Sequence, residues 1–274
     1  MTIGYCILAA LTGLILGSFF NVLIYRIPKN ISIVWPPSSC PHCAHKIAPW
    51  ENIPILGYLL LAGKCSKCSS PISWIYPGIE LITGIASLVL WQWYLAPQIL
   101  INAHEPWWSM VPTFFTALAL LLLIPIAVID IRHFIIPDAF TVPGSIIAIA
   151  ISFIPGGSTP LAMILGLIAG SGALFLTGLI GGMLLKKEAM GGGDVKLMAF
   201  YGALIGWKLS LISIFESAIA GSIAGIILMI AHGKSGRTHE DRQIPYGPFL
   251  AIGIWGSFFF GERLLMWYMS LFGA

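Results

Sequence analysis

The stretch Ala189-Met190-Gly191-Gly192-Gly193-Asp194-Val195-Lys196 lies between long apolar segments of the chain. Three consecutive glycines disfavour a helix interior, where each costs about 1 kcal/mol relative to alanine. They provide bare backbone that bends sharply and lets another chain approach closely. A carboxylate directly after such a bend, at a membrane boundary, indicates a functional site. We therefore expect Asp194 to work with a second acid, and Asp130 is the only one inside the apolar run 114–136.

The composition is typical of a membrane protein. Of the 274 residues, 58% are hydrophobic and only 9% are charged, whereas a soluble domain carries about 25% charged residues. The net charge of +3 is too small to indicate a nucleic-acid partner. No basic segment precedes the first apolar stretch, so we expect an uncleaved first span and not a signal peptide.

We predict an all-α polytopic membrane protein with about eight transmembrane helices, since a span needs about 20 apolar residues. The apolar segments are at about 2–25, 76–95, 113–131, 139–153, 161–185, 195–205, 209–231 and 245–271. The intervening residues 26–76 are polar, rich in proline and hold all the cysteines except Cys6. We therefore expect a first helix at 1–25, a small cytoplasmic zinc-binding insert at 26–76 and a transmembrane domain at 77–274.

The basic residues predict the orientation, because lysine and arginine mark cytoplasmic loops. With eight spans, 12 of the 14 basic residues fall on one side, and only Lys208 and Arg263 fall on the other. The N-terminus is then outside. Asp130 and Asp194 come to a common depth at the cytoplasmic face.

Cys40-Pro41-His42-Cys43 and Cys65-Ser66-Lys67-Cys68 are two CxxC knuckles with 21 residues between them. Tetrahedral Zn²⁺ with four thiolates favours this arrangement, because each knuckle supplies two ligands from one tight turn. The alternative is a pair of unrelated redox sites, but the reducing cytoplasm disfavours structural disulfides. We predict a closed, structural zinc site.

Two carboxylates held close together cannot both ionise, so they share a proton. One can act as a base on water while the other polarises a carbonyl, which is the chemistry of aspartic proteases. Asp138, in Ile136-Pro137-Asp138, competes with Asp130 for this role, but we interpret it as the N-cap of the next helix. Two alternatives stay open at this point. One is a proton-coupled membrane transporter, to which Glu80 and Glu216 would contribute, and the other is a zinc-ribbon adaptor without catalysis.

The motifs taken together resemble those of the bacterial type IV prepilin peptidases, which are bifunctional leader peptidases and N-methyltransferases. The match runs nearly end to end, over residues 17–26, 40–43, 50–54, 63–65, 76–80, Asp130 with 136–138, 191–194 and 244–249. The GxGD motif alone is shared by unrelated membrane aspartyl proteases, whereas the full set is specific. The chain departs from the family at Gly57, which is usually serine, and at Ile75, which is usually arginine.

This resemblance implies that Asp130 and Asp194 are the catalytic aspartates of a GxGD-type protease in the bacterial cytoplasmic membrane. It implies cleavage after the glycine that ends the short basic leader of a prepilin or pseudopilin. It also implies methylation of the new N-terminus, with S-adenosylmethionine as donor. The insert is associated with methylation, and the donor-binding residues would be Glu51, Gly63, Lys64 and Glu80. We expect Gly63 to allow close backbone approach to this ligand.

Overall fold

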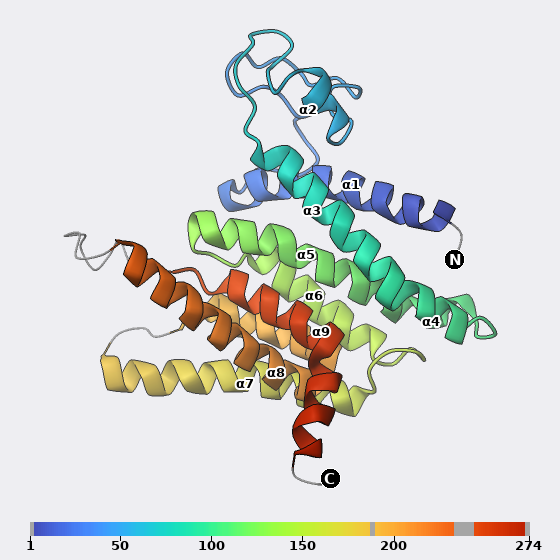
Figure 1. Cartoon of the computed structure of the whole chain (residues 1–274), viewed down its shortest axis with the longest axis vertical. Coiled ribbons are helices and arrows are strands. Elements are labelled where there is room, and N and C mark those ends of the chain that lie inside the picture. Colours follow the sequence, from blue (N-terminus) through green and yellow to red (C-terminus); the bar gives the residue numbers. More distant parts are fainter. Residues whose placement is uncertain (1–2, 187–189, 233–243, 272–274) are drawn as a thin grey trace. The chain divides into compact units, whose positions relative to one another are not determined.

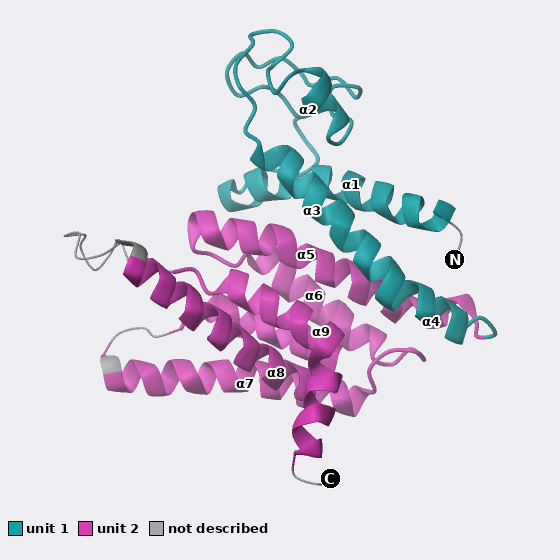
Figure 2. Ribbon diagram, in the orientation of Figure 1, with its two compact units in different colours: residues 1–104 teal, residues 105–274 magenta. Residues whose placement is uncertain are grey.

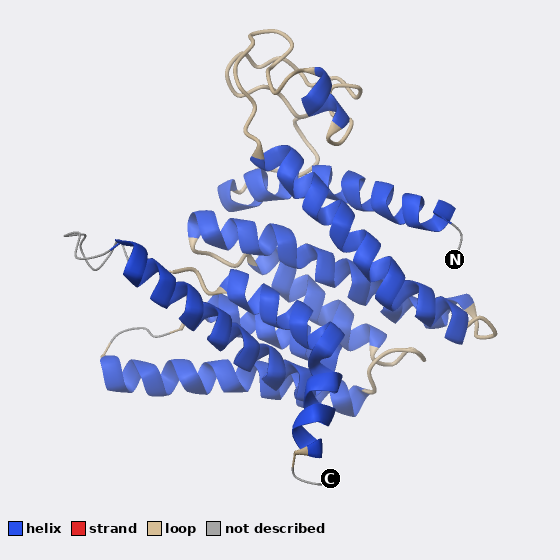
Figure 3. Ribbon diagram, viewed as in Figure 1, coloured by secondary structure: helices blue, strands red, loops and turns tan. Residues whose placement is uncertain are grey.

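The computed structural model describes residues 3–186, 190–232 and 244–271. These residues form helices and connecting loops, without a strand (Figure 3). The chain divides into two compact units, Met1–His104 and Glu105–Ala274 (Figure 2). The prediction of an all-α fold is confirmed, whereas the functional division after residue 76 stays a prediction.

Unit 1 consists of a long helix, a loop-rich insert and a second long helical stretch (Figure 1). The first part comprises α1 (Ile3–Arg26) and the 3-10 turn η1 (Ile27–Lys29). The insert contains α2 (Leu56–Leu60). The second stretch comprises α3 (Ile75–Leu90), the π-helical turn η2 (Trp91–Leu95) and α4 (Ala96–Ile101).

Small residues bring α1 and α3 close together, and a buried arginine connects α1 to the insert. A Cβ atom at Gly13 or Gly17 would overlap the backbone of α3, and this GxxxG spacing is typical of close helix pairs in membranes. The guanidinium of Arg26 is buried and donates to the carbonyls of Ser32 and Pro36, at 2.8 and 2.6 Å. The start of the insert is therefore fixed to the end of α1.

Unit 2 is built from apolar helices. It comprises the 3-10 turn η3 (Trp107–Met110), α5 (Val111–His133), α6 (Asp138–Ile151), α7 (Pro160–Leu185), α8 (Gly192–His232) and α9 (Gly247–Ser270). α8 is interrupted at Gly206, whose φ of 79° and ψ of 170° are not helical and suit a residue without Cβ. Gly166 of α7 and Gly202 of α8 face each other so closely that a Cβ on either would overlap the other's backbone.

Two side chains tie α5 to its neighbours. The phenol of Tyr201 in α8 donates to the carbonyl of Ala119, at 2.5 Å, and the indole of Trp255 in α9 donates to that of Leu120, at 3.0 Å. Inside a membrane such hydrogen bonds have no water to compete with them. They fix α5 against the two helices that carry the other groups of the candidate site.

Within the described residues, six helical stretches are long and apolar enough to cross a membrane. They are Ile3–Lys29, Ile75–Ile101, Trp107–His133, Pro160–Leu184, Gly192–Ile230 and Gly247–Ser270. The expected count of eight is not confirmed, for two physical reasons. α6 has only 14 residues, and the segments expected at 195–205 and 209–231 are joined in α8, with the interruption at Gly206 between them.

The predicted orientation stays a prediction. Four of the basic residues that support it, Lys187, Lys234, Arg237 and Arg242, lie outside the described residues.

Candidate active site and candidate metal site

Asp130 lies near the C-terminal end of α5, and only 5% of its surface is exposed. Its Oδ2 accepts a hydrogen bond of 2.8 Å from the backbone N–H of Gly247, the first residue of α9. A Cβ atom at position 247 would lie 2.7 Å from the same oxygen. The start of α9 therefore orients the carboxylate, and only glycine lets the backbone come this close.

Asp194 lies in the first turn of α8 and is 8% exposed. Among the described residues of unit 2, Asp130 and Asp194 are the two buried acids. Their carboxyl groups interact electrostatically. The structure thus brings together the two acids that the sequence pointed to, at the ends of helices α5 and α8.

The glycine run before Asp194 contains crowded and open positions. A Cβ at Gly191 would lie 2.9 Å from Oδ2 of Asp194, and one at Gly193 would lie 2.9 Å from Cβ of Ile136. Apart from its chain neighbours, a Cβ at Gly192 would meet no described residue within 4 Å. A side chain at either outer glycine of the GxGD pattern would therefore displace Asp194 or Ile136, whereas the middle position is open among the described residues. The expectation that the run avoids a helix is wrong in part, because α8 begins at Gly192, where first-turn N–H groups need no helical partner.

Asp138 is a partner of Lys196 and not a helix cap. α6 begins at Asp138 itself, and no side-chain hydrogen bond caps the helix. Nζ of Lys196 lies 2.8 and 2.9 Å from the two carboxylate oxygens of Asp138. Together with the contact of Ile136 at Gly193, this ion pair holds residues 136–138 against the chain on both sides of Asp194. The N-cap interpretation is wrong because a charged partner from α8 takes the carboxylate.

Sequence reasoning missed the site roles of Lys196, Tyr246 and Gly247. The hydroxyl groups of Tyr246 and Ser217 lie 2.7 Å apart, and Tyr246 also interacts electrostatically with Asp194. The available signal was the Pro245-Tyr246-Gly247-Pro248 turn, since a glycine enclosed by bulky residues marks a close backbone approach.

The four cysteines of the insert form a compact cluster in unit 1. Sγ of Cys40 lies 3.8 Å from Sγ of Cys68, and Sγ of Cys43 lies 3.9 Å from Sγ of Cys65. All four sulfurs lie within 4.8 Å of one another. A tetrahedral Zn²⁺ site with Zn–S bonds of about 2.3 Å has S···S edges of about 3.8 Å. The prediction that these four cysteines can hold one metal ion is confirmed.

The two knuckles share one backbone geometry. Ala44 N donates to Cys40 O and Ser69 N donates to Cys65 O, both at 2.9 Å. The φ values of Ala44 and Ser69 are 56° and 58°. The repeated CxxC spacing therefore folds into two equivalent turns, each of which presents two sulfurs to the same point.

Without a bound cation, a thiolate at one cysteine affects how easily its neighbours lose their protons. The backbone N–H groups of Cys43 and His42 lower the pKa of the Cys40 thiol to about 6. The N–H of His45 acts in the same direction on Cys43, but desolvation and the other three sulfurs outweigh it and raise that pKa to about 12. A bound cation would favour the thiolate at every position, as metal ligation requires.

The carboxylate of Glu51 makes its polar contacts within the insert. Oε2 accepts a hydrogen bond from Ala48 N, at 2.8 Å, and lies 3.2 Å from Nε2 of His45. Hydrogen bonds from the Ser66 hydroxyl and the Ala48 N–H lower the pKa of Glu51. Glu51 therefore links the regions of both knuckles. A Cβ at Gly57 would overlap the carbonyl oxygen of Glu51, so this packing favours glycine where the family usually has serine.

The other predicted donor-binding residues differ in whether contacts within unit 1 already engage them. Gly63 has a φ of 68°, and a Cβ there would lie 2.9 Å from Oη of Tyr58. The fold of the insert therefore requires this glycine, independently of any ligand. Oε2 of Glu80 accepts a 2.7 Å hydrogen bond from Ile55 N, whereas the side chain of Lys64 is exposed. Of the four residues, Lys64 alone has no structural role in these contacts.

A buried pair of carboxylates at helix ends, with a separate four-cysteine cluster, defines a class of protein: a polytopic membrane protein with two buried acids and an insert that can hold a metal ion. The family follows from comparison with known proteins. The Bacterial Peptidase A24 N-terminal domain matches residues 11–94, and the Type IV leader peptidase family matches residues 117–226. The chain belongs to the type IV leader peptidase family.

Curated relatives agree with this assignment. A protein from Neisseria gonorrhoeae is 33% identical over 96% of this chain and 94% of its own length, and one from Aeromonas hydrophila is 31% identical over 98% and 95%. One from Myxococcus xanthus is 34% identical over 86% and 67%. All three are named prepilin leader peptidase/N-methyltransferase. No solved structure matches.

The predictions of this family and of an enzyme are confirmed, whereas the transporter alternative receives no support from the comparisons. The spans and the relatives indicate a multi-pass protein of the bacterial inner membrane.

Proposed function

We propose that this protein removes the basic leader of prepilins or pseudopilins and methylates the new N-terminal residue. Relatives that match nearly the whole chain carry both activities in their names. The observation that supports the peptidase reaction best is the electrostatically coupled pair Asp130 and Asp194, the buried acids among the described residues of unit 2.

The two aspartates supply the base and the acid that peptide hydrolysis needs. One carboxylate takes a proton from water while the water oxygen attacks the scissile carbonyl carbon. The other, protonated member donates its proton to the carbonyl oxygen. When the C–N bond breaks, the leaving amine takes up a proton. The N–H of Gly247 holds Oδ2 of Asp130, which leaves Oδ1 for proton transfer.

We place the backbone of the substrate next to Gly192, the open position of the glycine run. A prepilin segment around the cleaved bond must be extended so that both aspartates reach its carbonyl. Within 4 Å of a Cβ added at Gly192, the part of the chain that the structure describes places no atom besides the chain neighbours. A substrate strand lying there would pass directly beside Asp194.

We assign methyl transfer to unit 1, through the insert. S-adenosylmethionine supplies the methyl group when bound, and the new N-terminal amine of the pilin receives it. Glu51, Gly63 and Glu80 shape the insert through their contacts with Ala48, Tyr58 and Ile55. The exposed ammonium of Lys64 suits the carboxylate of the donor.

We propose zinc as the metal of the four-cysteine cluster. The S···S distances of 3.8 and 3.9 Å suit its tetrahedral radius. Four protein ligands fill the coordination sphere, so the role is structural and not catalytic.

The proposed orientation has the N-terminus outside and both activities at the cytoplasmic face, because with eight spans 12 of the 14 basic residues face the cytoplasm. In this view 1–25 is the first helix, 26–76 the zinc insert and 77–274 the peptidase domain.

The proposal is tested with purified, full-length protein in detergent and a panel of prepilins. Mass analysis is expected to show loss of the leader from its client, and a further methyl group only when S-adenosylmethionine is present. Intact prepilins throughout the panel would contradict the proposed reaction.

A further inference from the structure

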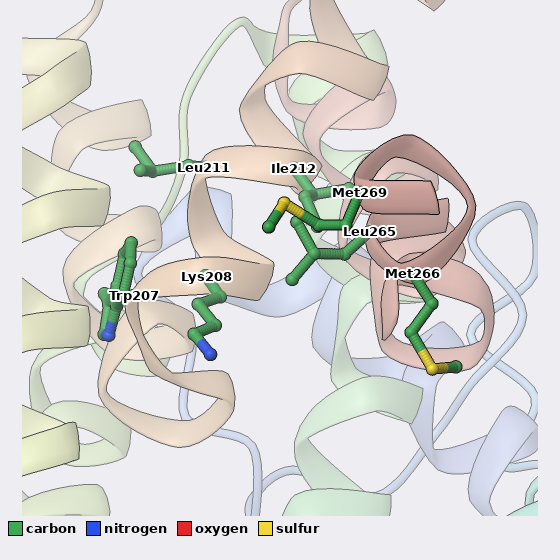
Figure 4. Close-up of a pocket in the computed structure, with 7 residues that line it drawn as sticks. All are labelled: Trp207, Lys208, Leu211, Ile212, Leu265, Met266 and Met269. Atoms are coloured by element: carbon green, nitrogen blue, oxygen red, sulfur yellow. The ribbon is translucent and has the colours of Figure 1, made fainter. Parts of the chain in front are cut away.

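A pocket of about 600 Å³ lies between α8 and α9 in unit 2 (Figure 4). Four lining residues follow the interruption of α8, and three belong to the last turns of α9. They are Trp207, Lys208, Leu211 and Ile212 on α8, and Leu265, Met266 and Met269 on α9. Except for the ammonium of Lys208 and the indole N–H of Trp207, the lining side chains are apolar.

The sequence of α9 explains why the two helices part here. Gly253, Ser257 and Gly261 recur every fourth residue and are buried. Gly253 packs on the backbone of α8, and a Cβ at Gly261 would lie 2.7 Å from the side chain of Leu209. The next two positions of the same row are the large residues Leu265 and Met269. Close packing therefore ends at Gly261, and the space beyond it is the pocket.

We propose that this pocket binds one anionic phospholipid, with an acyl chain between the helices and its phosphate at Lys208. Both walls belong to stretches that are apolar and long enough to span a membrane, so lipid is the solvent at this surface. Methionine side chains adapt their shape to a flexible chain. The single positive charge among the lining residues also favours a lipid with a net negative charge over a zwitterionic or neutral one.

Lys208 is placed for a lipid phosphate. In the described part of the chain no carboxylate pairs with it, since the ion pairs there are His45–Glu51 and Lys196–Asp138. Its Nζ lies 5.8 Å from the ring centroid of Trp207. Tryptophan and lysine together are typical of the headgroup level of a membrane.

Native mass spectrometry of the full-length, delipidated protein tests this proposal. The probes are phosphatidylglycerol and phosphatidylcholine with identical acyl chains. The unaltered protein is expected to bind one phosphatidylglycerol more tightly than phosphatidylcholine. Lys208→Gln is expected to weaken the binding of phosphatidylglycerol about fivefold and that of phosphatidylcholine by a smaller factor.

Two further variants make the test specific. Arg263→Gln is the matched control, because Arg263 is exposed on α9 and does not line the pocket. It is expected to leave both affinities unchanged. Leu265→Trp fills the space between the helices and is expected to weaken the binding of both lipids. The proposal is overturned if the unaltered protein does not prefer phosphatidylglycerol, if Lys208→Gln and Arg263→Gln act alike, or if Leu265→Trp changes neither affinity. Thermal unfolding of each variant checks that the fold is intact.

Discussion

The side chains of Asp130 and Asp194 can be tested by an isosteric change. Asparagine has nearly the shape of aspartate but cannot accept a proton from water at neutral pH. We expect Asp130→Asn and Asp194→Asn each to lower cleavage about a thousandfold or more. Asp138→Asn should lower it only about fivefold, because it weakens an exposed ion pair. The measurement is leader removal at equal enzyme amounts.

If Asp138→Asn and Asp194→Asn lose activity equally while Asp130→Asn stays active, Asp138 and not Asp130 is the partner of Asp194.

The glycines around the aspartates provide a matched set of alanine substitutions. Gly247→Ala and Gly191→Ala would each place a Cβ within 3 Å of a carboxylate oxygen, at 2.7 and 2.9 Å. We expect both to lower kcat at least tenfold, because displacement of a catalytic group by a fraction of an ångström is costly. The methyl group of Gly192→Ala would have no neighbour within 4 Å among the described residues beyond those adjacent in the chain, so in the absence of substrate the variant should fold normally.

The Gly192→Ala enzyme also tests where the substrate lies. We expect a raised KM with nearly unchanged kcat, since the methyl group would enter the space assigned to the substrate backbone. An unchanged KM would place the substrate elsewhere.

The ion pair of Asp138 and Lys196 predicts rescue by charge exchange. Asp138→Lys and Lys196→Asp should each lower kcat of cleavage, because like charges then meet beside Asp194. The double variant restores an opposite pair and should recover most of the activity. If the activation free energy of the double variant rises by the sum of the two single increases, the pair has no role in positioning Asp194.

At the scale of elements, we expect the insert to depend on a bound metal ion for its structure. It has few regular hydrogen bonds, with α2 of five residues and two isolated bridges, Ser39 with Lys46 and Lys64 with Pro71. Metal binding contributes about 10 kcal/mol or more to small zinc domains. We expect one zinc per chain by elemental analysis, and loss of the metal with local unfolding in Cys40→Ser. Freely titratable thiols in the unaltered protein, without metal, would show that the insert folds by another means.

Within the insert, adjacent residues separate a binding role from a folding role. Lys64→Ala removes an exposed side chain, so we expect normal metal content and normal cleavage but slower methylation. Gly63→Val forces a β-branched residue to a φ of 68° beside Tyr58, so we expect loss of metal as well as of methylation. If Lys64→Ala methylates at the normal rate, the donor site does not include this side chain.

At the scale of the whole molecule, the sequence predicted those features that depend on residues close together in the chain. The CxxC spacing predicted the metal ligands, and long apolar segments predicted membrane helices. The count of eight spans is not confirmed, since α6 is short and the two helical segments of α8 meet directly at Gly206. Contacts between distant segments left little trace in the sequence. Neither the bond from Gly247 to Asp130 nor the pair of Lys196 with Asp138 follows from periodicity, because each depends on how helices pack.

The hydrogen bond from Gly247 to Asp130 joins residues that are 117 positions apart, and this has a consequence for synthesis on the ribosome. α5 and the start of α8 are made long before α9, so a partly translated chain holds both acids without the N–H that orients one of them. With the proposed two-aspartate mechanism, we therefore expect activity only after α9 has entered the bilayer.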